Sequence, residues 1–206
     1  MPLTVLTHSI AAHLLTKLRN VQTSPDQFRP LTRSLTSILV SEATRELPTR
    51  SLIIRTPLEE TQGVELKTEP VLVPILRAGL GMLDAALDLL PTSHVGYVGL
   101  ERDEKTALAR AYYSKLPQLG DRSVLVLDPM LATGGSAATC VAQLYAQGAA
   151  HVKLICIVAA PEGVRLLEAQ FPDLHIVTAS LDRELNDKKY ILPGLGDFGD
   201  RLFGTF

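Results

Sequence analysis

The clearest pattern in the chain is a repeated alternation between short apolar runs and segments with apolar residues at helical spacing. The apolar runs cover residues 71–76, 95–100, 123–127, 152–158 and 174–177, and the helical segments cover residues 80–90, 136–147 and 162–171. Such alternation predicts an α/β fold with a mostly parallel central sheet flanked by helices. Residues 124–127 have no polar position, which is expected where helices cover both faces of the sheet.

The first third of the chain has a different pattern. Residues 31–47 place apolar side chains at helical spacing, and Pro48 closes this segment, so it predicts an amphipathic helix. Residues 52–55 and 64–67 indicate two short strands with a turn at Gly63 between them. We therefore expect an N-terminal helix and hairpin region beside the sheet.

Composition and charge narrow the classes of protein that fit. The 206 residues are 46% hydrophobic, which suits one globular domain spanning residues 1–206. The net charge of -2 gives no basic field that would attract nucleic acid or an anionic membrane. Residues 1–20 lack the apolar stretch of a signal peptide, and no segment reaches the length of a membrane span. Cys140 and Cys156 have no metal-ligand spacing and indicate reduced thiols in a cytoplasmic protein.

The loops after the apolar runs are the expected place for chemistry, because ligands of open parallel sheets bind at the carboxyl ends of the strands. After Leu127 the chain reads Asp128-Pro129-Met130-Leu131-Ala132-Thr133-Gly134-Gly135-Ser136 and enters a helical segment. The glycines allow close backbone approach, Thr133 and Ser136 offer hydroxyl groups, and the helix N-terminus favours an anion. These features predict a phosphate-binding loop without the lysine of nucleoside triphosphatases. The alternative is a tight turn with Ser136 as the helix N-cap.

This loop resembles the phosphoribosyl pyrophosphate loop of type I phosphoribosyltransferases. Most members of that family have two adjacent acids before the loop, whereas Asp128 is followed by Pro129, as in the uracil-specific branch. Further segments similar to that branch follow the same order, at residues 74–82, 159–163 and 193–205. The resemblance covers nearly the whole chain.

The resemblance implies a type I phosphoribosyltransferase-like fold and the transfer of ribose 5-phosphate from phosphoribosyl pyrophosphate to N1 of uracil, giving UMP and pyrophosphate. The implied catalytic residues are Arg77, Arg102, Asp128 and Asp197. The same four residues, with Pro129, Met130, Leu131, Ala132, Thr133, Gly134, Gly135 and Ser136, are implied to bind phosphoribosyl pyrophosphate. Ile191, Gly196, Asp197 and Phe198 are implied to bind uracil, in a base-binding hood formed by residues 180–206 and the N-terminal segment.

Each of these side chains has a chemical role and an alternative. Arg77 and Arg102 could hold the negative charge of departing pyrophosphate. For Arg77 the alternative is a solvated strand end, and Arg102 lies in a charged stretch that could equally be an exposed turn. Asp128 would accept hydrogen bonds from the ribose hydroxyls, or it could simply cap a turn. Carboxylate and phosphate oxygens suit Mg2+, which is implied near Asp197 through substrate and water, without a dedicated protein cage.

The tail from residue 182 to 206 does not continue the alternation, and its Gly, Asp and Pro content is typical of a lid or binding loop. Residues 194–199 satisfy Gly-x-Gly-x-x-Gly, but too few residues follow for a dinucleotide site. The tripeptide at 197–199 matches a kinase magnesium motif, whose companion motifs are absent. The family usually has a small residue in place of Phe198, whose ring could stack near the base, narrow its pocket or point away.

Two alternatives compete with an active uracil enzyme. One is a regulator of the same fold, weak or inactive in catalysis, that senses UMP or phosphoribosyl pyrophosphate; a regulator that bound RNA would show a basic stripe, and the chain has none. The other is a hypoxanthine or orotate enzyme, which would carry two acids before the loop. The resemblance further implies a GTP effector, a homo-oligomer (dimer or tetramer), and a flap over residues 102–113 that excludes water.

Overall fold

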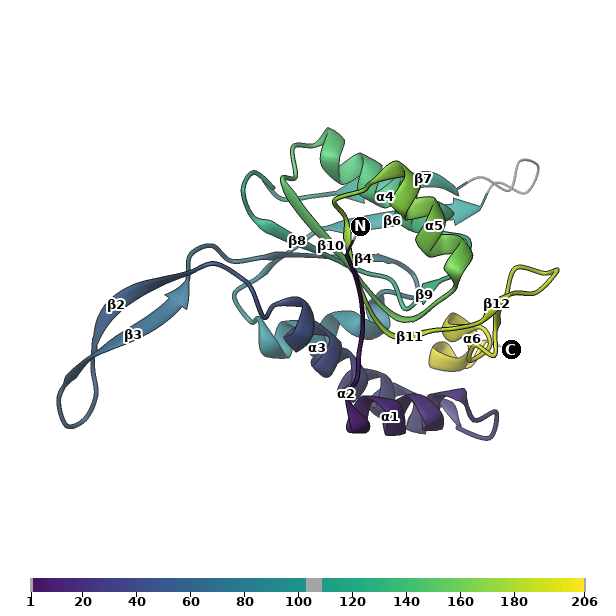
Figure 1. The fold of residues 1–206 in the computed structure, drawn as a ribbon, viewed down its shortest axis with the longest axis horizontal. Coiled ribbons are helices and arrows are strands. Elements are labelled where there is room, and N and C mark those ends of the chain that lie inside the picture. Colours follow the sequence, from purple (N-terminus) through teal and green to yellow (C-terminus); the bar gives the residue numbers. More distant parts are fainter. Residues whose placement is uncertain (1, 103–108, 206) are drawn as a thin grey trace.

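A mostly parallel sheet forms the centre of the molecule, and helices cover both of its faces (Figure 1). The computed structural model describes residues 2–102 and 109–205, with the backbone alone at residues 101, 102 and 109–111. Within these ranges the strand order is β1-β11-β10-β8-β4-β6-β7, with β5 beside β4 and β9 beside β10. The pairing is parallel except where β7 runs antiparallel to β6.

The elements follow the predicted alternation closely in the middle of the chain. The sheet strands are β1 (Leu3–Val5), β4 (Val71–Leu76), β5 (His94–Val95), β6 (Tyr97–Arg102), β7 (Ala109–Lys115), β8 (Ser123–Leu127), β9 (Met130–Leu131), β10 (His151–Ala159) and β11 (His175–Leu181). The helices are α1 (Ser9–Arg19), α2 (Pro25–Ala43), α3 (Leu80–Leu89), α4 (Gly135–Ala146), α5 (Pro161–Gln170) and α6 (Phe198–Phe203). The predicted strand at 95–100 is divided at Gly96 into β5 and β6. The α/β prediction is confirmed.

The core has one apolar cluster on each face of the sheet. Helices α1, α2, α3 and α6 contribute to the first cluster, and α4 and α5 contribute to the second. In β8, Leu125 and Leu127 belong to the first cluster, whereas Val124 and Val126 belong to the second, and all four are fully buried. Burial on both faces explains why this strand has no polar position.

The N-terminal region differs from the prediction in its boundaries. Helix α2 begins at Pro25 rather than residue 31, because proline is well suited to the first helical turn, and it ends at Ala43 rather than 47. Helix α1 and strand β1 have no counterpart among the predicted elements. Strand β1 pairs in parallel with β11 and extends the sheet at that edge. None of the described helices is long and apolar enough to cross a membrane.

The hairpin consists of β2 (Thr49–Arg55) and β3 (Glu60–Leu66), paired antiparallel. Its turn lies at residues 56–59, where the Thr56 side-chain oxygen accepts hydrogen bonds from the next two available amides. The turn predicted at Gly63 is wrong, since Gly63 lies within β3 opposite Leu52. The threonine-based turn replaces the glycine turn because its side chain satisfies the backbone locally.

The hairpin projects away from the body of the molecule (Figure 1). It leaves large apolar side chains in solvent, with Ile53 71%, Val64 72% and Leu58 95% exposed. An isolated two-stranded hairpin is marginally stable in water, and exposed apolar side chains of this kind form a patch on its surface.

The tail forms a small structure of its own at the carboxyl edge of the sheet. Strands β12 (Glu184–Leu185) and β13 (Ile191–Leu192) pair antiparallel, and α6 follows them. Helix α6 packs against α2 and contributes to the first core cluster. The tail is therefore ordered against the body and positioned beside the loops that follow the strands (Figure 1).

Candidate active site

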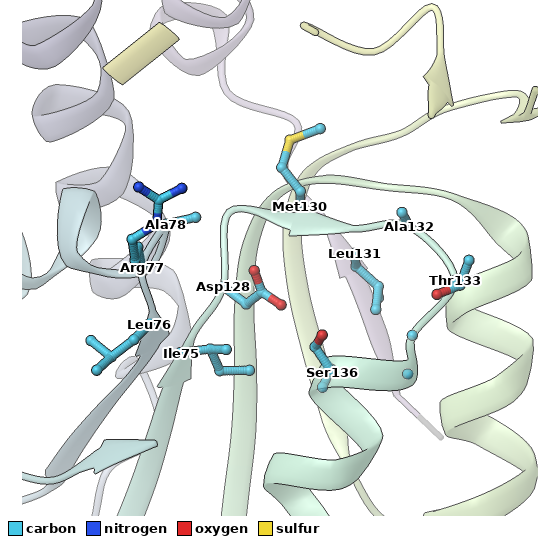
Figure 2. A pocket seen from close by; sticks show the side chains of 13 residues that line it. Ile75, Leu76, Arg77, Ala78, Asp128, Met130, Leu131, Ala132, Thr133 and Ser136 are labelled. Atoms are coloured by element: carbon cyan, nitrogen blue, oxygen red, sulfur yellow. The ribbon is translucent and has the colours of Figure 1, made fainter. Parts of the chain in front are cut away.

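A cavity of about 290 Å³ lies at the carboxyl ends of β4 and β8 (Figure 2). It is lined by Ile75, Leu76, Arg77, Ala78, Asp128, Met130, Leu131, Ala132, Thr133, Gly134, Gly135, Ser136 and Ala137. We call it the phosphate cavity. The structure thus brings together the loop after β4 and the predicted phosphate loop.

The phosphate loop is shaped by its backbone. Gly134 has φ +84° and serves as the N-cap residue of α4, without a side-chain cap hydrogen bond, so the alternative with Ser136 as N-cap is wrong. A side chain at Gly134 would lie 3.0 Å from the carbonyl oxygen of Gly163, so α5 approaches the loop closely here. Within the described residues, the hydroxyls of Thr133 and Ser136 have no hydrogen-bond partner. Together with the first amides of α4, they can bind a phosphate.

Short strand β9 fixes the phosphate loop to the sheet. Its two residues pair with the end of β10, and the Leu131 carbonyl accepts a hydrogen bond of 2.8 Å from the Ala160 amide. Pro129 is buried and does not line the cavity; its carbonyl accepts hydrogen bonds from Ile157 and Val158. The contact predicted for Pro129 therefore has no support in the cavity lining, whereas all the other predicted residues of this loop line it.

Asp128 lies at the end of β8, and its carboxylate points into the phosphate cavity (Figure 2). Burial raises the pKa of this carboxyl to about 7, although a hydrogen bond from the Met130 backbone partly opposes the shift. Keeping a half-buried carboxylate ionised without a counter-ion costs free energy when no ligand is bound. Its position suits a ligand that offers hydroxyl donors.

Arg77 lies on the opposite wall of the phosphate cavity, and its side chain is exposed. It follows β4 directly, across a cis peptide bond from Leu76. A side chain at Gly79 would clash with backbone oxygens of Leu127 and Ile75, so only glycine lets this loop lie against both strand ends. The loop is seated on the sheet, and the guanidinium is available to an anion.

A second cavity of about 230 Å³ adjoins the first. It is lined by Ala78, Met130, Ala132, Lys189, Tyr190, Ile191, Gly196, Asp197, Phe198 and Gly199. The first three of these residues also line the phosphate cavity. All four residues predicted to contact uracil belong to this lining, and we call it the base cavity.

Sequence reasoning missed four residues of the base cavity, Ala78, Gly199, Lys189 and Tyr190, and the last two come from one loop. Their position directly before Ile191 is the signal that could have found them. Lys189 has φ +66°, and it is the one described non-glycine residue with positive φ. Asn186 organises this loop, because its side-chain oxygen accepts hydrogen bonds from the amides of Lys188 and Tyr190.

A buried ion pair holds the tail loop beside the base cavity. Asp182 accepts two hydrogen bonds from Arg19, of 2.8 and 2.6 Å, and one of 2.8 Å from the Gly194 amide. Arg19 also donates to the Gly194 carbonyl at 2.6 Å. Burial alone would raise the pKa of Asp182, but the hydrogen bonds from Arg19, Ser180 and Gly194 outweigh it and lower the pKa. Helix α1 and the tail loop are thereby joined.

Comparison with known proteins identifies the family. The family model described as uracil phosphoribosyltransferase matches residues 5–205. The chain is 48% identical to the uracil phosphoribosyltransferase of Fervidobacterium nodosum and 47% identical to that of Dictyoglomus thermophilum, each over 98% of both chains. The chain belongs to the uracil phosphoribosyltransferase family.

Solved structures share the fold of this chain. The AQ2163 protein of Aquifex aeolicus superposes with a TM-score of 0.93 at 38% identity, covering 98% of this chain and 97% of that one. The adenine enzyme of Giardia lamblia, described as an APRTase, gives a TM-score of 0.53 at 14% identity, with 76% and 82% of the chains covered. The second likeness shows the type I phosphoribosyltransferase fold alone.

Phe198 stands where the resemblance implies a small residue. Its ring is 2% exposed and packs edge-on against Phe28, with ring centroids 5.3 Å apart. The same ring lies close to Gly81 at the start of α3. Of the three orientations considered for the Phe198 ring, the structure has the one that points away from the base, because the ring lies in the core.

The structure describes the side chain of Asp197 but not that of Arg102. Asp197 is exposed in the base cavity and caps α6, because one carboxylate oxygen accepts a 3.0 Å hydrogen bond from the Asp200 amide. It does not line the phosphate cavity. Arg102 ends β6, and its side chain lies outside the described residues. The flap predicted over 102–113 falls partly outside them too, and its described end forms β7. The roles predicted for Arg102 and for the flap therefore stay predictions.

The oxygen atoms at the two cavities fit a magnesium ion carried by substrate. Asp128 and Asp197 supply carboxylates to adjoining cavities, and such hard oxygen ligands suit Mg2+. Among the described residues, no group of three or more His, Cys, Asp or Glu is placed to hold a metal by itself. The donor set therefore fits an ion that is bound mainly by phosphate oxygens and water.

Proposed function

We propose that the chain catalyses the transfer of ribose 5-phosphate from phosphoribosyl pyrophosphate to N1 of uracil, giving UMP and pyrophosphate. The observation on which this proposal depends is that the phosphate cavity and the base cavity share Ala78, Met130 and Ala132. A ligand with a phosphate in one cavity and a pyrimidine ring in the other would therefore pass along a wall that both cavities share. Family membership over nearly the whole chain supports the same reaction.

In this proposal the phosphate cavity holds phosphoribosyl pyrophosphate. The first amides of α4 and the hydroxyls of Thr133 and Ser136 bind the 5-phosphate. Asp128 accepts hydrogen bonds from the ribose hydroxyls, in its ionised form. Arg77, and Arg102 by resemblance, hold the pyrophosphate as negative charge develops on it. Mg2+ bound to the pyrophosphate oxygens would neutralise part of that charge.

The base cavity would orient uracil for attack. Backbone amides and carbonyls around Ile191, Gly196 and Phe198 can read the carbonyls and N–H groups of a neutral ring. The bond from C1 of ribose to pyrophosphate breaks as the bond from C1 to N1 forms on the opposite face, and the N1 proton is released. The ribose would pass through an oxocarbenium-like state. Since no protein nucleophile is needed, catalysis would rest on orientation and on stabilising the departing charge.

The test is UMP formation from uracil and phosphoribosyl pyrophosphate with Mg2+, with orotate, cytosine and hypoxanthine as competing bases. We expect turnover that is selective for uracil. Binding of phosphoribosyl pyrophosphate without turnover on any base would instead favour the regulator that senses UMP or phosphoribosyl pyrophosphate. Arg77→Ala serves as the active-site control and should remove turnover while the protein stays folded.

The proposal extends to a homo-oligomer assembled through the hairpin. A second copy is the occupant expected for the exposed apolar side chains of Ile53, Leu58 and Val64, because an isolated hairpin needs a cover. Replacing Ile53 and Val64 by Thr should shift the molecular mass in solution from dimer or tetramer toward monomer. An unchanged mass would place the interface elsewhere on the molecule.

The proposal also includes a GTP effector site and a cytoplasmic location. A cavity of about 400 Å³ between α2, α3 and α6 is lined by Arg29, Arg33 and Asp84. The two arginines would hold the phosphates of a GTP effector once Arg33 is released from its ion pair with Asp88. Arg33→Gln should weaken any GTP activation in the UMP assay while turnover without GTP stays the same. A cytoplasmic location is consistent with Cys140 and Cys156, which are free and buried.

A further inference from the structure

Arg201 lies behind the base cavity and donates hydrogen bonds to two separate segments of the chain, the end of α1 and the tail loop. One of its guanidinium nitrogens donates to the carbonyl of Leu195 at 2.7 Å and also to the carbonyl of Leu18, at the end of α1. The other donates to the Asn20 carbonyl at 2.6 Å. The side chain does not line the base cavity. Arg201 is thus placed to act on the cavity through the backbone.

The charge of Arg201 has no carboxylate partner among the described ion pairs. Its acceptors in the described residues are backbone carbonyls, and its guanidinium carbon lies 4.7 Å from the centre of the Phe28 ring. Burial lowers the pKa of Arg201. A partly buried cation held only by dipoles keeps a strong field at the groups that it touches.

The bond to Leu195 fixes the orientation of the next peptide group. The Leu195–Gly196 peptide is trans, so its carbonyl and its N–H point in opposite directions. Because the carbonyl faces Arg201, the Gly196 N–H faces away from it. Gly196 lines the base cavity, and its amide makes no hydrogen bond to any described residue. Within the described residues this N–H is a donor without a partner, in a residue that lines both the base cavity and the neighbouring cavity that Arg201 lines.

We propose that Arg201 is a positioning residue for base recognition, which orients and polarises the Gly196 N–H as the donor to one carbonyl of uracil. A charged donor on the carbonyl side withdraws electrons from the peptide group, and this strengthens the N–H as a donor. The effect grows as the ring oxygen becomes more negative, which occurs when N1 loses its proton. The inference rests on the proposed function and assigns a residue outside the cavity to it.

The ion pair of Arg19 with Asp182 provides a useful contrast. Arg19 also holds the tail loop, but it donates to Gly194, which does not line the base cavity. A merely structural role would make the loss of Arg201 and the loss of Arg19 equivalent. A role in orienting the Gly196 N–H makes Arg201 specific for one atom of the base.

The experiment is a cycle between the Arg201→Gln variant and uracil analogues, 2-thiouracil and 4-thiouracil, in which sulfur accepts hydrogen bonds weakly. We expect the KM for uracil to rise about 10–100-fold in Arg201→Gln, the range of one charge-assisted hydrogen bond, while the KM for phosphoribosyl pyrophosphate stays within about twofold. For one analogue the losses from variant and sulfur should not add, and for the other they should. Arg45→Gln, an exposed arginine paired with Glu42, is the matched control and should change neither KM.

Additive losses for both analogues would overturn the proposal and leave Arg201 a structural residue. If the unmodified protein does not turn over uracil at all, the proposed function fails, which is a separate result. Should Arg201→Gln not fold, Arg201→Lys keeps the charge and should raise the uracil KM less. A measurement without any variant is the amide proton shift of Gly196, which should move downfield on adding UMP but not ribose 5-phosphate; an unmoved signal would contradict the proposal.

Discussion

The phosphate loop and the tail loop line adjoining cavities, but they are held in place by different means. The phosphate loop is fixed by backbone contacts, through β9 on β10 and the close approach of Gly134 to Gly163. The tail loop is fixed by side chains from other elements, chiefly Arg19 from α1 and Arg201 from α6. The first loop is a local motif, and the second depends on a network that spans the molecule.

This difference predicts how each loop fails. Changes to the side chains of the phosphate loop should affect one substrate and leave the rest of the protein intact, because the loop is held to the sheet by its backbone. Changes in the arginine network should reduce the free energy of unfolding and base recognition together, because the same hydrogen bonds serve both. The predictions below test that separation.

The largest effect is expected for Asp128→Asn. An amide keeps the shape of the carboxyl but loses the charge that would accept hydrogen bonds from the ribose hydroxyls. We expect kcat/KM for phosphoribosyl pyrophosphate to fall about 100–1000-fold, the scale of losing one charged hydrogen-bonding group at a reacting substrate. Steady-state kinetics would measure it, and a fall of less than about fivefold would remove Asp128 from the mechanism.

Asp182→Asn should have its main effect on the free energy of unfolding. It leaves the Arg19 guanidinium partly buried without a counter-charge, and we expect the free energy of unfolding to fall by about 2–4 kcal/mol in urea titrations. The KM for uracil should rise as well, while the KM for phosphoribosyl pyrophosphate stays constant. The exposed pair of Arg50 with Glu65 is the control, and Glu65→Gln should cost less than about 0.5 kcal/mol. Equal effects of both variants would contradict the proposed network.

The pKa of Asp128 predicts a third effect, on the pH dependence of stability. Burial raises its pKa from 3.8 to about 7 in the folded protein, so the ionised form is disfavoured there. Its contribution to stability is fully present below pH 3.8 and is lost as the pH rises through about 7. Asp128→Asn should therefore unfold with about 1–4 kcal/mol more free energy than the unmodified protein at pH 8, and with little difference near pH 4. A difference independent of pH would contradict this assignment.

Local patterns explain which parts of the fold and site could be predicted from the sequence. Strands β4 and β8 match the predicted bounds, because burial on both faces leaves continuous apolar runs. The loop that lines the first cavity was predictable as a site because its glycines and hydroxyls are adjacent in the sequence, and its role in binding phosphate stays a prediction. Helix α1 was missed because its apolar residues alternate with exposed polar ones over only 11 residues.

Other parts of the site depend on contacts that no local pattern contains. The pairing of Arg19 with Asp182 joins residues 163 positions apart, and the bond from Arg201 to Leu18 joins residues 183 apart. The orientation of Phe198 likewise follows from Phe28, in another helix. These contacts and orientations follow from tertiary packing, whereas the family resemblance implied only which residues belong to the site.

A pair of glycine variants compares the two loops directly. Gly134 and Gly196 have φ of +84° and +82°, so alanine should cost about 1–2 kcal/mol from backbone strain at either position. The cost should be larger at Gly134, because its side chain would lie 3.0 Å from the Gly163 carbonyl oxygen. Gly134→Ala should raise the KM for phosphoribosyl pyrophosphate, and Gly196→Ala that for uracil, each about tenfold. Gly148 is the matched control, since it has φ +85° and open space around it. Gly148→Ala should lose the stability that backbone strain alone costs, with both KM values unchanged; a change in either would show that backbone strain acts at a distance.

The smallest effect is expected at Lys189, in the loop that borders the base cavity. A lysine at φ +66° is strained, and glycine relieves that strain but gains freedom in the unfolded chain. The net result for Lys189→Gly should be a gain of about 0.5–1 kcal/mol in the free energy of unfolding. Lys188→Gly, one position earlier and without positive φ, should lose about as much. If both variants lose stability, the left-handed backbone at Lys189 carries no strain that glycine can relieve.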